Sequence, residues 1–163
     1  MYQSIQLKPK KDESLRRFHP WVFSGALAQG PSLPAEGDLV RVFAADGSFL
    51  GVGHYQIGSI AVRILSFHDQ PIDKDFYLAA LSSALQLRKE LNLLRSDNNT
   101  YRLVHGEGDH LPGLIIDLYG DTAVIQAHSV GMHRDLELIM AALKDVMATE
   151  GLNHIYYKSE GTL

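Results

Sequence analysis

The sequence of 163 residues contains no cysteine. Disulfide bonds, a thiolate nucleophile and cysteine-ligated zinc are therefore excluded within this chain. No apolar run approaches the length that a membrane-spanning helix needs, and the first eight residues contain no apolar signal-peptide core. These absences predict a cytoplasmic protein with no membrane partner.

The glycine-rich fingerprints of nucleotide-binding loops are also missing. Gly106 and Gly108 are followed by Leu111 at the position where a dinucleotide fingerprint has its third glycine. The sequence has no Gly-Lys-Ser/Thr phosphate loop and no glycine-rich strand-to-helix turn suited to a nucleoside cofactor. We therefore predict no cofactor site in this chain. We also assign it no metal ligand and no catalytic residue, for reasons given below.

Charge is present but unevenly distributed. The formal net charge is −4, and 45% hydrophobic with 21% charged residues is typical of a globular chain with a buried core. Residues 1–24 carry five basic and two acidic side chains, a net charge of +3, whereas residues 101–163 carry four basic and nine acidic side chains, a net charge of −5. The beginning of the chain is therefore suited to phosphate groups, and its last third is not.

Short alternating segments predict a small β-barrel-like domain over residues 1–70. The expected strands are residues 4–8, 38–43, 49–56 and 60–67. Gly51 and Gly53 lie within the third of these strands and predict a bulge or bend.

A basic segment from Lys10 to Phe18 predicts a short helix or turn. It ends before Pro20, because residues ahead of a proline avoid helical angles. Trp21 and Phe23 follow directly. Core packing and base stacking both suit these aromatic side chains, and we favour core packing.

The rest of the chain predicts an α+β arrangement. Asp73 is the expected N-cap of a helix, so that residues 71–100 form a connecting helix and turn. The apolar stripe of this helix is expected at Leu78, Leu81, Leu85 and Leu91. Residues 101–163 predict three strands, a helix and a last strand, with a tight hairpin turn at Gly120 and Asp121. The buried stripe of the second helix is expected at Leu136, Ile139, Met140, Leu143 and Met147.

The loop after the first of these three strands is dense in ionisable groups. His105, Glu107, Asp109 and His110 have side chains suited to acid/base catalysis or metal binding. The alternative is a polar turn whose glycines supply unusual backbone angles. We favour the turn, because proximity in sequence does not make side chains converge.

Three segments resemble one protein family. They are residues 16–25 (Arg-Arg-Phe-His-Pro-Trp-Val-Phe-Ser-Gly), residues 101–115 with their glycine-rich loop, and the terminal Ile155-Tyr156 with Lys158-Ser159. Together they resemble the S-adenosylmethionine (SAM)-dependent methyltransferases that make 5-methylcytosine in large-subunit ribosomal RNA. The resemblance implies a PUA-type RNA-binding domain, a small α+β linker domain and a Rossmann-like methyltransferase domain, of which this chain is similar to the first two.

The methyltransferase domain is expected to be absent. Residues 156–163 show no cap, no charged tail and no decline in hydrophobicity, which predicts a chain that is cut short. Methylation at carbon 5 of cytosine needs a thiolate that first adds to the ring, and this chain has no cysteine. The resemblance therefore implies that SAM and the reactive thiol belong to a missing C-terminal domain, while this chain recognises ribosomal RNA.

The resemblance also implies which residues contact RNA. We expect phosphate contacts from Lys10, Lys11, Arg16 and Arg17, and a weaker one from Arg63. A solvated face remains the alternative for the three arginines. Two other functions stay open: a small metal- or acid/base-dependent enzyme that uses the loop from His105 to Asp109, and a structural dimerisation module. A homodimer is a further candidate assembly, because a truncated domain exposes apolar surface meant for a partner.

Overall fold

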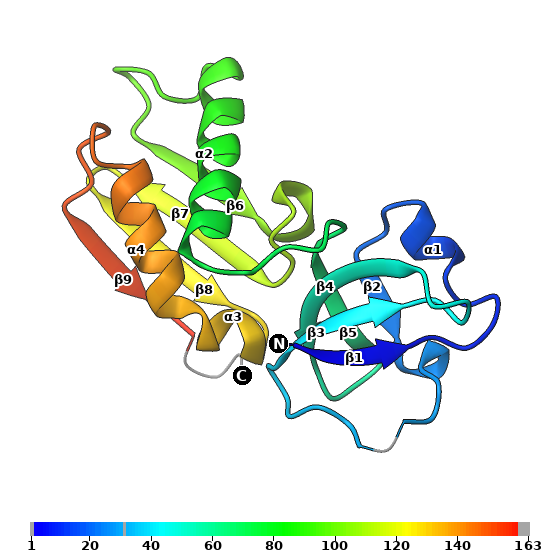
Figure 1. Cartoon of the computed structure of the whole chain (residues 1–163). Coiled ribbons are helices and arrows are strands. Elements are labelled where there is room, and N and C mark those ends of the chain that lie inside the picture. The colour runs from blue at the N-terminus through cyan, green and yellow to red at the C-terminus, as the bar shows by residue number, and fades with distance from the viewer. Residues whose placement is uncertain (1, 31, 160–163) are drawn as a thin grey trace. The chain divides into compact units, whose positions relative to one another are not determined.

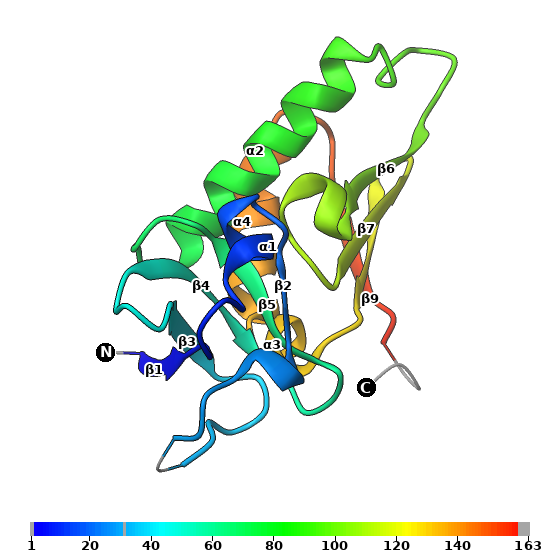
Figure 2. The same ribbon diagram turned by 90° about the vertical axis from the view of Figure 1, so that its right-hand side faces the viewer.

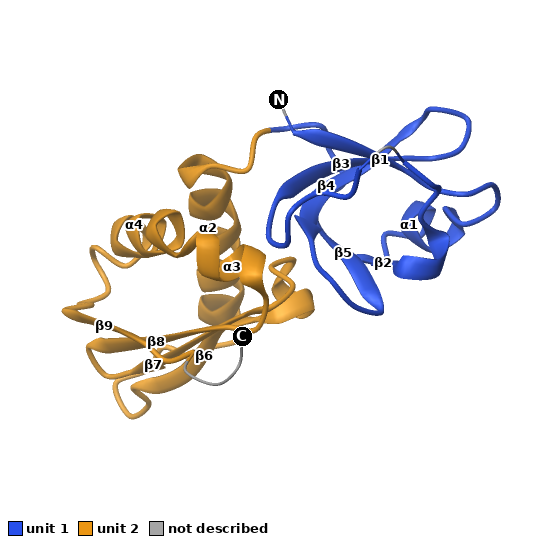
Figure 3. Ribbon diagram, turned by 90° about the horizontal axis from the view of Figure 1, so that it is seen from below, with its two compact units in different colours: residues 1–70 blue, residues 71–163 orange. Residues whose placement is uncertain are grey.

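The computed structural model describes residues 2–30 and 32–159, and Figure 1 labels its helices and strands. The chain divides into two compact units, residues 1–70 and residues 71–163 (Figure 3). Among the described residues, every helix is too short or too polar to cross a bilayer. The sequence predicts an abrupt chain end without a helix cap or a charged tail. Its last four positions, 160–163, lie outside the described residues.

Unit 1 is built on a five-stranded sheet with the strand order β1-β3-β4-β5-β2. β1 runs parallel to β3, and the other neighbouring strands are antiparallel. Its elements are β1 (Gln3–Gln6), α1 (Glu13–Arg16), β2 (Trp21–Phe23), the 3-10 helix η1 (Ser24–Ala26), β3 (Leu39–Phe43), β4 (Phe49–Tyr55) and β5 (Ile60–Ser66). The strands expected from alternation are confirmed, and β2 is an additional strand at the edge.

The ends of this sheet approach each other beyond the regular ladders. Leu7, directly after β1, forms an isolated antiparallel bridge with Leu27, directly after η1. The backbone N–H of Lys8 donates to the carbonyl oxygen of Ala26 at 2.8 Å. The two edges of the sheet, at β1 and β2, are therefore linked by a short bridge, and the sheet curves around its core as expected for a barrel-like fold.

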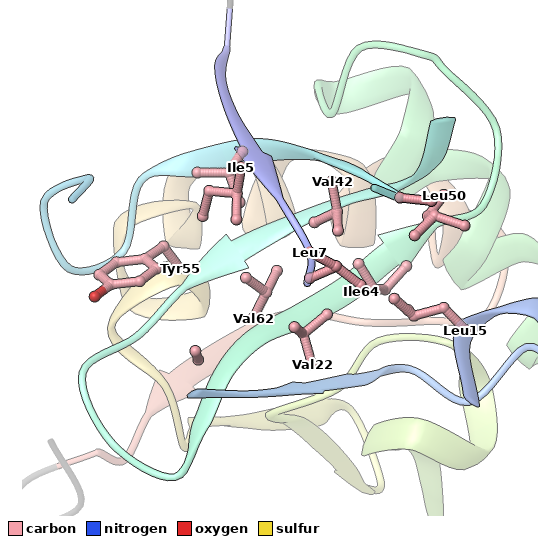
Figure 4. Close-up of a cluster of buried hydrophobic side chains, with 12 residues drawn as sticks. Ile5, Leu7, Leu15, Val22, Val42, Leu50, Tyr55, Val62 and Ile64 are labelled. Carbon is pink, nitrogen blue, oxygen red and sulfur yellow. The ribbon is translucent and has the colours of Figure 1, made fainter. Parts of the chain in front are cut away.

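Side chains from every strand of this sheet and from α1 meet in one apolar core. Figure 4 shows the labelled members pointing toward one another: Ile5, Leu7, Leu15, Val22, Val42, Leu50, Tyr55, Val62 and Ile64. Leu15 is the buried residue of α1, and Val22 is the buried residue of β2. Each therefore anchors a short element whose remaining side chains lie toward solvent.

The bulge expected from the glycines of β4 is confirmed. The register between β4 and β5 shifts between Val52 and Gly53. At this position the two backbones approach so closely that a side chain on Gly53 would meet the backbone of Arg63. Glycine is therefore required here for close approach of two strands.

Unit 2 is a four-stranded sheet covered by helices. Its strand order is β6-β7-β8-β9, with β6, β7 and β8 antiparallel and β9 parallel to β8. The elements are α2 (Lys74–Glu90), β6 (Thr100–His105), the 3-10 helix η2 (Gly106–Asp109), β7 (Leu114–Tyr119), β8 (Thr122–Ala127), α3 (Val130–Arg134), α4 (Leu136–Val146) and β9 (His154–Tyr157). Figure 3 shows α2 and α4 on the same face of the sheet. The predicted order of three strands, helix and strand is confirmed, and α3 is an extra short helix.

Two local predictions in unit 2 are confirmed, and one is wrong. The side chain of Asp73 accepts a hydrogen bond from the backbone N–H of Phe76 at 3.1 Å and so caps α2. Gly120 adopts a φ of +60° in the hairpin turn between β7 and β8. Leu91 does not belong to the apolar stripe of α2, because the helix ends at Glu90 and leaves this side chain 59% exposed.

Candidate nucleic-acid interface

A pocket of about 400 Å³ lies between the segment that enters α1 and the edge strand β2. Figure 2 shows α1 and β2 next to each other in unit 1. Lys10, Lys11 and Glu13 line one part of the pocket, and Trp21 and Phe23 line another. The fold thus brings two of the five predicted RNA contacts together with two aromatic side chains.

Lys10 and Lys11 occupy a tight turn before α1. Lys10 adopts a left-handed backbone conformation with a φ of 61°, and the backbone N–H of Lys11 donates to the carbonyl oxygen of Lys8 at 3.2 Å. Both side chains are exposed, and neither ammonium group is paired with any residue that the structure describes. Their charges are therefore available to an external anion.

The expectation that Trp21 and Phe23 pack in the core is wrong. Successive side chains of a strand point to opposite faces, and Val22 takes the core side of β2. Phe23 is consequently 48% exposed, and Trp21 is only half-buried. The two rings form a perpendicular pair with centroids 6.4 Å apart, and His19 meets Trp21 in the same way at 5.4 Å. The run Trp21-Val22-Phe23 is apolar throughout, so the sequence carries no signal of which face of the strand is exposed.

Arg16 and Arg17 are held by carboxylates of this chain. The Nε of Arg16 donates to Asp12 at 2.6 Å, and its Nη2 donates to the Ser48 hydroxyl at 3.1 Å. The hydrogen bond with Asp12 raises the pKa of Arg16 above its ordinary value. Arg17 pairs in the same way with Glu13 through its Nη2. Both arginines remain exposed, but an RNA phosphate must compete with these partners.

Arg63 lies beside the aromatic residues rather than among the lysines. It is directly opposite Trp21 in the antiparallel pair of β2 and β5. Directly opposite residues of such a pair share one face of the sheet. Its guanidinium donates to the side-chain oxygen of Gln56 and is partly buried. Arg63 therefore lies next to Trp21, and its guanidinium is held in place by the hydrogen bond to Gln56.

The ionisable loop of unit 2 does not gather into a site. Asp109 is buried, and both of its carboxylate oxygens accept hydrogen bonds from the Arg88 guanidinium. It also accepts the backbone N–H of His105 at 2.6 Å. No group of three or more His, Asp or Glu side chains within the described ranges is arranged to hold a metal ion. The arrangement fits the polar turn, with η2 as a 3-10 turn that Asp109 ties to Arg88.

Two backbone N–H groups of unit 2 that lie where a nucleoside cofactor would be expected form hydrogen bonds within the chain. The parallel strand pair in this unit is β8 and β9, and a nucleoside cofactor would be expected where β8 leads into α3. There the Ser129 hydroxyl caps α3 by accepting the Met132 N–H at 3.3 Å. The N–H of Ala127 donates to the Ser159 hydroxyl at 2.8 Å. These two N–H groups are thus used by the chain itself.

Comparison with known proteins gives one match to a domain family and many to methyltransferases. Residues 5–67 match the family described as a PUA-like domain. The chain is 40% identical over 162 residues to ribosomal RNA large subunit methyltransferase I of Alteromonas mediterranea, covering 98% of this chain and 40% of that protein. It is 35% identical over 161 residues to the protein of the same name from Vibrio cholerae, again covering 98% and 40%. The chain therefore spans about two fifths of the length of these relatives.

Two solved structures share the fold. One is a Streptococcus mutans protein assigned as a SAM-dependent methyltransferase, with a TM-score of 0.82 and 18% identity over 96% of this chain and 40% of that one. The other is a protein assigned as a methyltransferase and solved in complex with SAH, with a TM-score of 0.83 and the same identity and coverage. This chain thus contains a PUA-like domain at residues 5–67 and is homologous, over nearly its whole length, to part of the proteins named ribosomal RNA large subunit methyltransferase I.

Proposed function

We propose that this chain is the RNA-recognition and linker portion of a SAM-dependent ribosomal RNA (cytosine-5) methyltransferase, and that it is not catalytic by itself. The observation that carries the proposal is the exposed basic and aromatic pocket within the PUA-like domain. Free ammonium groups beside aromatic rings are the combination that binds a nucleic-acid backbone and its bases. The names of the relatives support ribosomal RNA as the target.

The proposed division of labour follows from what this chain contains. Its relatives are about two and a half times as long, since the chain covers 40% of their length. A cytosine-5 methyltransferase uses a thiolate, and none of the 163 residues is cysteine. We therefore assign the thiol and SAM to the remainder of the full-length protein, with domain boundaries in this chain at residues 1–70, 71–100 and 101–163.

Among the proposed RNA contacts, Lys10 and Lys11 rank above Arg16, Arg17 and Arg63. The two lysines line the pocket without an internal partner among the described residues. Each of the three arginines already donates to a side chain of this chain. Binding through an arginine therefore requires that part of an existing interaction be given up, which lowers its net contribution.

The double substitution Lys10→Ala and Lys11→Ala is expected to weaken RNA binding at every sequence tested. A lysine that neutralises one phosphate contributes about 0.7 to 1 to the slope of log affinity against log salt concentration, so the slope should fall by about 1.4 to 2. Fluorescence anisotropy of a labelled ribosomal RNA hairpin, titrated at several salt concentrations between about 50 and 200 mM, measures this slope.

The matched control removes two lysines of unit 2, Lys89 and Lys144. It changes the net charge by the same amount, and both side chains are exposed at sites outside the pocket. The control should leave the slope close to that of the unchanged chain. Equal slopes for the two double variants would refute the proposed surface, and absence of any salt-dependent RNA binding would refute the proposed function.

The single substitution Arg17→Ala is expected to weaken RNA binding through Glu13. Arg17 neutralises the Glu13 carboxylate, which lines the pocket beside Lys10 and Lys11. Without Arg17 this carboxylate repels phosphate, so affinity should fall by a few-fold at low salt. Adding Glu13→Gln should restore most of the affinity, as measured by the same anisotropy titration. If Glu13→Gln restores nothing, Arg17 contacts RNA directly instead.

A further inference from the structure

We propose that the pocket formed by Lys10, Lys11, Trp21 and Phe23 receives one unpaired nucleobase, so that the chain prefers RNA with an extruded nucleotide over fully paired RNA. The inference deepens the proposed function and rests on it. The volume of about 400 Å³ lies within the range of about 300–1,000 Å³ that is usual for small-molecule pockets. The pocket is therefore large enough for a group the size of a base and far too small for a duplex.

The ring geometry supports stacking. Trp21 and Phe23 form a perpendicular pair with an interplanar angle of 88°. A perpendicular pair uses at most one face of Phe23, so the other face of the Phe23 ring lies outside this pair and can receive a planar partner. Phe23 is 48% exposed on a strand that lies at the edge of the sheet. Bases are planar and stack on such rings only when they are unpaired and turned out of the helix.

The charges place a phosphate next to the base. Lysine is a compact point charge on a flexible stem and adapts to a phosphate without fixed geometry. Lys10 and Lys11 supply two such charges, while the one carboxylate of the lining, Glu13, is paired with Arg17. The lining is therefore positive at one part and aromatic at the other. An unpaired nucleotide offers a phosphate to the lysines and a base to the aromatic rings. An apolar peptide would match only the aromatic part of the pocket, and an acidic peptide only the basic part.

Trp21 is the one tryptophan of the sequence, so its fluorescence reports on this pocket directly. The experiment titrates the whole chain with three RNA hairpins that share one stem: fully paired, with a single bulged nucleotide, and with an abasic site at the bulge. The bulged hairpin should quench Trp21 and bind about 5- to 160-fold more tightly than the other two, as expected for one stacked base.

The substitution Phe23→Ala should abolish this preference and leave the salt slope unchanged. Phe23→Leu keeps the apolar volume without the aromatic face and should behave in the same way, provided that thermal denaturation shows both variants folded. Phe18→Ala is the matched control, because Phe18 is 72% exposed and lies outside the pocket lining, against Phe67 at 5.2 Å. It should leave the preference intact.

The outcomes separate this inference from the function on which it rests. Equal affinities for the three hairpins, with no quenching of Trp21 but a normal salt dependence, would overturn the base pocket and leave RNA recognition standing. Tighter binding of the abasic hairpin than of the paired one, with no effect of Phe23→Leu, would assign the preference to backbone shape and also overturn it. Failure to bind any hairpin would remove the proposed function itself.

Discussion

Replacing Asp109 by alanine is expected to lower the free energy of unfolding by about 3–5 kcal/mol, the usual effect of leaving one partner of a buried ion pair alone. The side chains of Arg88 and Asp109 are 9% and 4% exposed. Nη2 of Arg88 donates to Asp109 at 2.7 Å, and its Nε donates to the carbonyl oxygen of Arg102 at 3.0 Å. The substitution would leave the charged guanidinium of Arg88 buried between α2 and β6 without a carboxylate partner.

The control for this prediction is Asp117→Ala in the same unit. Asp117 accepts two hydrogen bonds from Arg102, at 2.7 and 3.1 Å, and the side chains of Arg102 and Asp117 are 45% and 13% exposed. Solvent screens the exposed guanidinium, so this pair should contribute about 1 kcal/mol, less than the buried pair, and the variant should unfold within a few degrees of the unchanged chain. Thermal denaturation followed by circular dichroism compares the two variants.

A double substitution tests whether the stranded charge causes the destabilisation. Arg88→Met combined with Asp109→Leu removes both charges and fills the site with apolar side chains, which should recover part of the stability. Full recovery is not expected, because the N–H of His105 and the carbonyl of Arg102 lose their partners. If Asp109→Ala lowers the free energy of unfolding no more than Asp117→Ala does, the pair of Arg88 and Asp109 has no structural role. That result would favour the acid/base interpretation of the loop again.

Replacing Gly53 by alanine is expected to destabilise unit 1 by about 3 kcal/mol, the upper part of the range for overpacked sites. A Cβ at this position would lie 2.0 Å from the carbonyl oxygen of Arg63 and 2.8 Å from the Cα of Ile64. Both atoms belong to the backbone of β5, so no side-chain rotation relieves the clash. Either the bulge must open or the β4–β5 ladder must separate.

Gly25→Ala is the matched control, because among the described residues no atom beyond its two chain neighbours lies within 4 Å of the position that its Cβ would take. It should change the unfolding free energy by less than about 0.5 kcal/mol. Urea denaturation of both variants measures the difference. A Gly53 variant as stable as the Gly25 variant would mean that β4 and β5 are not paired as described.

Features that depend on neighbours in sequence are predicted well. The Asp73 cap, the Gly120 turn and the bulge at Gly53 follow from local hydrogen bonding or backbone conformation. The pairing of Arg16 with Asp12 and of Arg17 with Glu13 also has a visible signal, since four residues separate the members of each pair. Side chains at this spacing meet on a helix.

Features that depend on distant segments are predicted less well. The sequence favours a core position for Trp21 and Phe23, because apolar composition does not say which face of a strand is covered. Their exposure depends on the pairing of β2 with β5, which places Val22 inward. The role of Asp109 is equally hidden, since its partner Arg88 is 21 residues away in the sequence.

The order of strands and helices, the uneven charge and the absence of a thiol are properties of the sequence alone, because each is written in the periodicity or composition of neighbouring residues. Only the tertiary structure decided that two lysines and two aromatic side chains share a pocket, and that a conspicuous aspartate is part of a buried ion pair. The physical reason is that sheet pairing and burial are set by contacts between segments far apart in the chain. These contacts determine which side chains stay accessible and which have their charge neutralised by an internal partner.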